Sequence, residues 1–189
     1  WGVNGVMVVG LAGITALRQR ADWDGTNLFC SWAHASTPTG LFDAYPIRAQ
    51  KLNGSGVAQW TANGVVVHTP VTGSPFFETF VPVENLVVSD RLGGCYVAWF
   101  DPRNYNQPAP NTFLHGDDIY GQRLDVNGVA QWTANGAPID STAGGLDRLL
   151  VCTDAANGMF LCSTDFTFGD GHEDISLWPI NGASAPNSV

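Results

Sequence analysis

Two loops of this chain place a histidine next to two acidic residues, in the runs His115–Asp118 and His172–Asp174. Carboxylate oxygens are the ligands that calcium prefers, but calcium takes about six to eight of them. The candidate metal ligands are Asp117, Asp118, Glu173 and Asp174. The alternative is that these residues are solvated turn residues, with Asp118 and Asp174 binding backbone N–H groups where a strand begins. Because two adjacent carboxylates are too few, we favour the second interpretation and expect no metal or cofactor.

The segment Asp101-Pro102-Arg103 predicts a loop salt bridge, in which Asp117 or Asp118 could take part, and we expect its role to be structural. No nucleophile elbow, phosphate-binding loop, zinc-protease motif or dinucleotide fingerprint occurs in the chain. A glycosidase carboxylate pair cannot be chosen from the sequence, because the separation of the two groups in space defines it. We therefore expect no catalytic residues.

Aromatic residues that are not repeated cluster in two long loops, at 70–82 and 102–116. Exposed aromatic side chains on loops often mark contact surfaces. The candidate contact residues are Phe76, Phe77, Phe80, Tyr105 and Phe113. The alternative is that both loops fold back and bury these rings.

Four cysteines, Cys30, Cys95, Cys152 and Cys162, stand in apolar runs, and no two form a C-x-x-C pair. This pattern argues against a structural zinc site and favours buried thiols. A disulfide between Cys152 and Cys162 is the alternative, because these residues flank the turn 155–158 and could face each other across a hairpin.

The elements that carry these residues recur along the chain. Residues 49–64 (AQKLNGSGVAQWTANG) and 121–136 (GQRLDVNGVAQWTANG) are identical at eleven of sixteen positions, and residues 1–8 (WGVNGVMV) repeat the final part of the signature. Trp1, Trp60 and Trp132 therefore share one position. We expect them to pack in the same way in each copy, the alternative being that they are platforms for sugar rings.

Each repeat predicts two hairpins and four strands, which in the second copy lie near 86–89, 95–100, 119–125 and 129–139. Both alternating faces of 95–100 are apolar, so this strand must be covered on both sides. The strand at 119–125 is more amphipathic, which suits an outer strand. The pattern predicts an all-β, β-propeller-like fold of about three four-stranded antiparallel blades.

We expect a single domain over 1–189. Residues 1–9 would form the outer strand of a split blade, followed by blades at 10–69, 70–140 and 141–189. The last blade lacks its outer strand, and Trp1–Val9 could supply it beyond Ile175–Ile180. Because propellers typically have about four to eight blades, three suggest incompleteness. The chain would be a fragment of a longer propeller, half of a six-bladed dimer, or three blades capped by other proteins.

The composition restricts the partners. The chain has 189 residues and a mass of 20.1 kDa, with 44% hydrophobic and 13% charged residues, so it can bury a sizeable core. Its net charge is −9, and Lys51 is its only lysine, which argues against nucleic acid and anionic membranes as partners. The apolar run Val6–Ala12 is shorter than the roughly 20 residues of a membrane span. We expect it to be a buried strand.

The segments SDRLGGCYVAWFDPR (89–103) and DIYGQRLDVNGVAQWTANGAPI (118–139) resemble the propeller-forming repeats of large secreted or cell-surface bacterial proteins. The resemblance covers most of the chain up to Trp178 and is clearest in the second unit. It implies a propeller architecture and an extracellular, periplasmic or cell-surface location. Such proteins share no common activity, so it implies no active site.

These observations favour a non-enzymatic interaction or structural module that binds other protein subunits or itself. One alternative is a carbohydrate-binding, lectin-like propeller, which predicts exposed aromatic residues in equivalent pockets. A second is a propeller glycoside hydrolase, which predicts carboxylates that converge at a central channel.

Overall fold

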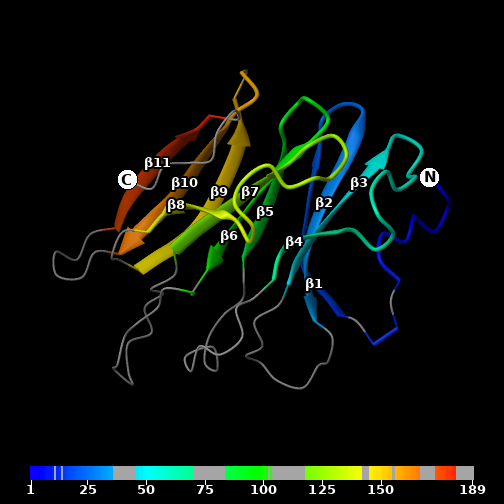
Figure 1. Cartoon of the computed structure of the whole chain (residues 1–189), viewed down its shortest axis with the longest axis horizontal. Helices are drawn as coiled ribbons and strands as arrows, with labels where there is room; N and C mark the ends of the chain where they lie inside the picture. The colour runs from blue at the N-terminus through cyan, green and yellow to red at the C-terminus, as the bar shows by residue number, and fades with distance from the viewer. Residues whose placement is uncertain are drawn as a thin grey trace.

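A computed structural model gives the fold of the chain (Figure 1). It describes residues 1–10, 12–13, 15–35, 46–69, 84–101, 103, 118–141, 145–154, 156–166 and 173–181. Within these ranges the chain forms strands and turns and no helix, so the predicted all-β class is confirmed. No helix long and apolar enough to cross a membrane occurs in these ranges.

Eleven strands form three antiparallel sheets, which lie side by side in chain order in Figure 1. The first sheet contains β1 (Thr15–Trp23), β2 (Asn27–Ala35), β3 (Ile47–Asn53) and β4 (Val65–His68). The second contains β5 (Asn85–Ser89), β6 (Cys95–Asp101), β7 (Asp118–Leu124) and β8 (Ala137–Asp140). The third contains β9 (Gly145–Thr153), β10 (Met159–Phe166) and β11 (Glu173–Ile180). Within each sheet, strands that follow one another in the sequence pair with each other, and the sheets of the described residues do not close into a ring.

An aspartate fixes the first hairpin of every sheet. In the second sheet, one carboxylate oxygen of Asp90 accepts hydrogen bonds of 2.8 Å from the backbone N–H groups of Leu92 and Gly94. Asp24 and Asp154 make the corresponding bonds in the first and third sheets. Because these bonds satisfy turn donors that have no ladder partner, the aspartate sets where the strands reverse.

A buried glutamine organises the repeated QWTANG turn. The side-chain oxygen of Gln122 accepts from the backbone N–H of Trp132 at 2.8 Å, and its amide donates to the carbonyl of Thr133 at 3.0 Å. Gln50 binds Trp60 and Thr61 in the same way. The turn extends to residue 136, so β8 begins at Ala137, later than the predicted start near 129.

The prediction that the third strand of the unit is a polar outer strand is wrong. β7 is buried along almost its whole length, and Gln122 is fully buried. A polar residue is tolerated there because the Gln122 side chain makes the bonds described above. The alternation of polar and apolar residues in this strand therefore did not indicate which of its side chains are exposed to solvent.

Two apolar layers hold the sheets together. Phe29, Trp60, Val97 and Trp99 belong to the layer between the first and second sheets. The layer between the second and third sheets includes the side chains of Tyr96, Ala98, Trp132, Leu149 and Leu161. All seven residues of β6 are buried, which confirms that this strand is covered on both sides. Trp60 and Trp132 are each 8% exposed and have the predicted packing role, whereas Trp1 is 60% exposed, so the prediction is wrong for the first copy.

The prediction of a strand over residues 1–9 is wrong. Residues 1–10 form a turn and no strand, and Met7 in the apolar run is 80% exposed. The segment lies on the first sheet, where Trp1 and Val6 lie next to Gly56. It does not pair with β11, which is hydrogen-bonded to β10 alone among the described strands. With no strand beside it, the segment has no ladder to join.

The four cysteines are free, so the predicted alternative of a disulfide is wrong. The register of the hairpin explains this, because Cys152 lies opposite Phe160 while Cys162 lies opposite Leu150. Burial also differs from the prediction of four buried thiols. Cys95 is buried, Cys30 and Cys162 are half-buried, and Cys152 is exposed.

Candidate functional site

The predicted site residues fall in different places. Asp118 begins β7, is 8% exposed and lies opposite Asp101. Glu173 and Asp174 begin β11, opposite Phe166 and Asp165. Asp117 and all five candidate contact residues (Phe76, Phe77, Phe80, Tyr105 and Phe113) lie outside the described residues. Among the residues that the structure does describe, no three or more His, Cys, Asp or Glu side chains form a group that could hold a metal ion.

The Asp101 carboxylate is the centre of a buried polar cluster between the first and second sheets. One of its oxygens accepts a hydrogen bond of 2.8 Å from the Trp99 indole and a short ionic bond from Arg103. The imidazole of His68, at the end of β4, lies 3.8 Å from the same oxygen. The predicted salt bridge within residues 101–103 therefore forms, and His68 is a member that sequence reasoning missed.

Arg103 links this cluster to the repeated turn. Its guanidinium donates to the carbonyl of Asn135 at 2.7 Å and lies 3.8 Å from the centre of the Tyr120 ring. Its backbone N–H donates to the second oxygen of Asp101 at 3.0 Å. These bonds occupy both carboxylate oxygens, so Asp101 is held as a structural anion.

The surroundings of Asp101 favour its charged form, whereas those of His68 favour its neutral form. Burial alone would raise the pKa of Asp101, but the hydrogen bonds from Arg103 and Trp99 outweigh it and hold that pKa below its usual value. Burial lowers the pKa of His68, although the charge of Asp101 partly opposes this. A neutral imidazole therefore packs against an ionised carboxylate. Both side chains are less than one-tenth exposed, and they link the first and second sheets.

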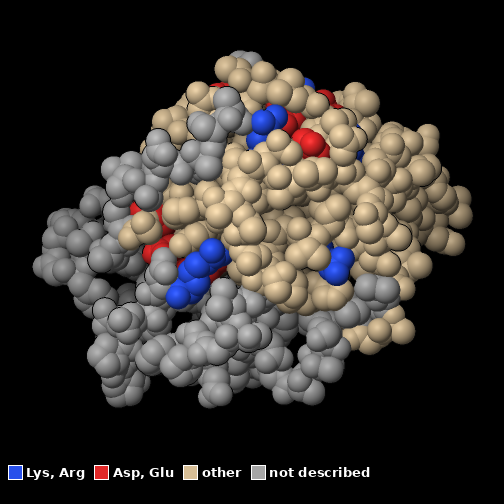
Figure 2. All heavy atoms as spheres, in the orientation of Figure 1, with Lys and Arg blue, Asp and Glu red and all other residues tan. Residues whose placement is uncertain are grey.

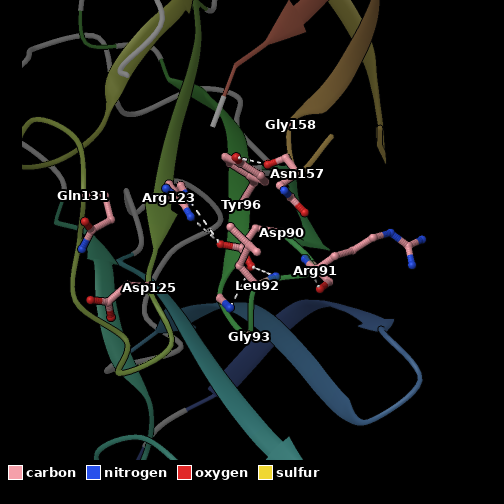
Figure 3. Close-up of polar contacts among 12 residues, drawn as sticks. Asp90, Arg91, Leu92, Gly93, Tyr96, Arg123, Asp125, Gln131, Asn157 and Gly158 are labelled. Atoms are coloured by element: carbon pink, nitrogen blue, oxygen red, sulfur yellow. Dashed lines mark hydrogen bonds and ion pairs between the residues drawn. The ribbon is translucent and has the colours of Figure 1, made fainter. Parts of the chain in front are cut away.

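A second polar cluster lies at the hairpin end of the second sheet (Figure 3). The Asp90 carboxylate oxygen that is not used in the turn accepts two bonds from Arg123, at 2.9 and 3.1 Å. Beside it, the Tyr96 hydroxyl donates to the carbonyl of Asn157, in the turn of the third sheet, at 2.7 Å. Burial raises the pKa of Tyr96 to about 12, so this hydroxyl remains protonated and keeps donating.

Polar bonds also join the first sheet to the second. The ammonium of Lys51 donates to the carbonyl of Gly93 at 2.8 Å, and the Trp60 indole donates to the carbonyl of Val126 at 3.1 Å. The Ser31 hydroxyl donates to the Asn85 side chain at 2.6 Å. These groups, like those of both clusters, act within the fold.

The third sheet has a different kind of surface. Five apolar or sulfur-bearing residues are exposed on its side away from the second sheet, which we call the outer face: Leu150, Cys152, Phe160, Ile175 and Leu177. Ile175 is 75% exposed and Leu177 is 61% exposed. Phe160 is paired with Cys152 in β9, and Cys162, two residues along β10, is paired with both Leu150 and Leu177, so these side chains share one face.

Sequence reasoning did not identify the outer face. Its signal was present, since Met159–Cys162 is apolar at four successive positions, as in the doubly covered strand β6. A second signal was the fourth strand that the repeat pattern predicts to be missing from this sheet, and the described residues of the sheet form three strands. Among the described residues, charged groups are sparse on the side of the molecule shown in Figure 2. Comparison of the chain with family models, with curated proteins and with solved structures found no match.

Proposed function

We propose that this chain is a non-enzymatic interaction or structural module, built from propeller-type blades, that works as part of a larger protein or assembly. The observation that carries the proposal is the apolar outer face of the third sheet. Soluble proteins rarely leave a broad apolar patch exposed unless it binds something. The resemblance of the repeats supports propeller blades and an extracellular, periplasmic or cell-surface location.

The repeat shows what kind of surface the outer face is. Cys152, Phe160 and Ile175 correspond in the repeat to Val88, Tyr96 and Ile119 of the second sheet. Those three residues are buried in the layer between the second and third sheets. The outer face therefore has the residue pattern of a surface that packs on another sheet, which favours a protein partner.

The polar clusters support a structural role. Asp90 and Asp101 each have both oxygens occupied by bonds within the fold. A glycoside hydrolase instead needs two carboxyl groups that reach the substrate. The repeated residues Trp60 and Trp132 are buried, so they offer no ring face on which a sugar could stack.

The enzymatic alternative can be tested directly. We expect no turnover of a panel of chromogenic glycosides and esters, and no retention on a glycan array. Activity that His68→Ala removes while the melting temperature stays within a few degrees would overturn the non-enzymatic proposal.

The binding surface is tested with a fluorescent hydrophobic probe. At low chain concentration, where no partner covers the outer face, we expect the wild-type chain to bind the probe and Ile175→Lys to reduce that binding. Leu92→Lys is the matched control, because Leu92 is 58% exposed but lies in the hairpin turn of the second sheet. Equal probe binding by all three chains would show that the outer face is not a binding surface.

A further inference from the structure

One aromatic pair occurs twice in the molecule. Phe29 packs on Trp60 with ring centres 6.0 Å apart, and Tyr96 packs on Trp132 at 5.8 Å. In the third sheet the corresponding strand position holds Phe160, which is 37% exposed. Among the described residues no tryptophan packs on this ring.

The other half of such a pair stands at the N-terminus. Trp1 occupies the repeat position of Trp60 and Trp132 and is 60% exposed. The turn after it is built in the same way, because Gly5 N–H donates to the carbonyl of Gly2 at 2.9 Å, as Gly64 N–H does to Thr61. Gly5 and Gly64 also have nearly equal positive φ angles, of 77° and 79°.

The N-terminal segment (residues 1–10) also contacts the first sheet in the way that residues 60–69 contact the second. Trp1 lies next to Gly56 as Trp60 lies next to Gly128. At the other end of each segment, a backbone N–H donates to an asparagine side chain of the neighbouring sheet. Gly10 donates to Asn63 at 3.2 Å, and Thr69 donates to Asn135 at 3.1 Å. The N-terminal segment therefore occupies the position of a fourth strand that belongs to a sheet next to the first.

In the part of the chain that the structure describes, the third sheet has no strand at the place that this segment would fill. Its order is β11-β10-β9, so β11 is an edge where the first two sheets have a fourth strand. An edge strand offers unpaired N–H and C=O groups to an incoming chain. Among the described residues, the third sheet thus has no fourth strand, and residues 1–10 stand in the place of a fourth strand that pairs with no sheet.

We propose that the partner of the outer face is a second copy of this chain. The N-terminal segment of that copy pairs along β11, its Trp1 packs on Phe160, and its first sheet covers the outer face. This inference rests on the proposed function and names the partner. Because the two contacting surfaces differ, the contact is heterologous, and copies either close on each other or form a chain.

Two features define the strength of this contact. Leu177 stands where the second sheet has Gly121, whose position lies directly beneath Trp132 and Ile139. An incoming Trp1 therefore sits less deeply than Trp132 does, and the contact is weaker than the internal ones. Each copy has a net charge of −9, so repulsion opposes association and added salt screens it.

Sedimentation velocity, at chain concentrations from about 1 to about 100 μM, tests the proposal. We expect species heavier than the 20.1 kDa chain, favoured by concentration and by moderate salt. Trp1→Asp and Phe160→Lys should each shift the midpoint of association at least tenfold in concentration, whereas Leu92→Lys should leave it unchanged. Melting temperatures within a few degrees of wild type show that the variants fold.

A mixing experiment establishes how the copies meet. Trp1→Asp alters the N-terminal segment and Phe160→Lys alters the outer face, so each variant keeps one intact surface. An equimolar mixture should form a one-to-one heterodimer that neither variant forms alone. If Trp1→Asp associates as wild type does, or if the mixture stays monomeric, the proposed head-to-tail contact is wrong.

The outcome for this inference is separate from that for the proposed function. A chain that is monomeric throughout, but whose outer face still binds the hydrophobic probe, overturns the second copy as partner and leaves the interaction module standing. Loss of the difference in probe binding between Ile175→Lys and Leu92→Lys overturns the interaction module itself.

Discussion

The second and third sheets are built from corresponding residues but have different surroundings. Both begin with a hairpin fixed by an aspartate, Asp90 or Asp154, and both continue with a strand whose first four residues are apolar. The second sheet is covered on both sides and has four strands. The third sheet has three strands and leaves one face exposed. Neighbouring sheets, rather than the strand sequence, therefore determine what is buried.

The widest contrast is between Tyr96, which is fully buried, and its counterpart Phe160, which is 37% exposed. Tyr96→Ala should lower the free energy of unfolding by about 3–5 kcal/mol, since it empties a packed site and removes the bond to Asn157. Phe160→Ala should cost about 1 kcal/mol or less. Urea denaturation at chain concentrations that keep the protein monomeric measures both values. Equal losses would mean that the outer face is covered within a single chain.

The hairpin aspartates give a smaller contrast. Asp90 forms an ion pair with Arg123 in the second sheet. The residue that corresponds to Arg123 in the third sheet is Pro179, which cannot form one. Asp90→Asn should cost about 1.5–3 kcal/mol, because it removes the charge from a buried, charge-assisted pair. Asp154→Asn should cost about 0.5 kcal/mol or less, since the amide oxygen still accepts the turn bonds. High salt should not abolish the Asp90 effect, because that carboxylate is 1% exposed. An equal cost for the two substitutions would show that the ion pair with Arg123 adds nothing to the turn.

The local elements of the fold could be predicted because short-range signals encode them. The Asp-Gly turns, the QWTANG repeat and the apolar runs predicted the hairpins and three sheets, and the shared Trp60 and Trp132 positions predicted packing. The sequence did not reveal burial that depends on distant partners. Gln122 is polar yet buried because the backbone of a later turn satisfies it, and Met7 is apolar yet exposed because no strand lies beside it.

The Asp101 cluster was predicted in part for the same reason. Asp101 and Arg103 are two residues apart, so their salt bridge could be expected from the chain alone. His68 belongs to another sheet and reaches Asp101 because the first and second sheets pack together. The repeat pattern did predict that the last sheet lacks a fourth strand, and the described residues of that sheet form three strands. The outer face itself depends on how the three sheets pack, which no local pattern shows.

The smallest predicted effect is a response to mild acid at the contact between the first and second sheets. Burial lowers the pKa of His68, and burial together with Arg48 lowers that of His34, which is also in the first sheet. The unfolded chain therefore takes up protons first, as the pH falls through the ordinary histidine value of about 6.5. Stability is complete above that pH and is lost as the pH falls from it toward the folded pKa values. The lowered pKa of Asp101 acts in a separate window, below the ordinary aspartate value of about 3.9.

Thermal melts between about pH 7.5 and about pH 5 isolate the histidine contribution, because Asp101 stays ionised throughout that range. The wild-type melting temperature should fall on acidification, and His68→Gln should fall less, since glutamine cannot take up a proton. His34→Gln removes the second histidine whose pKa is lowered, so the double variant should be the least sensitive. Hydrogen exchange, corrected for intrinsic rates at each pH, should show β4 losing protection before β9. If β9 loses protection first, acid opens the contact between the second and third sheets. The prediction that His68 makes the contact between the first and second sheets acid-sensitive would then be wrong.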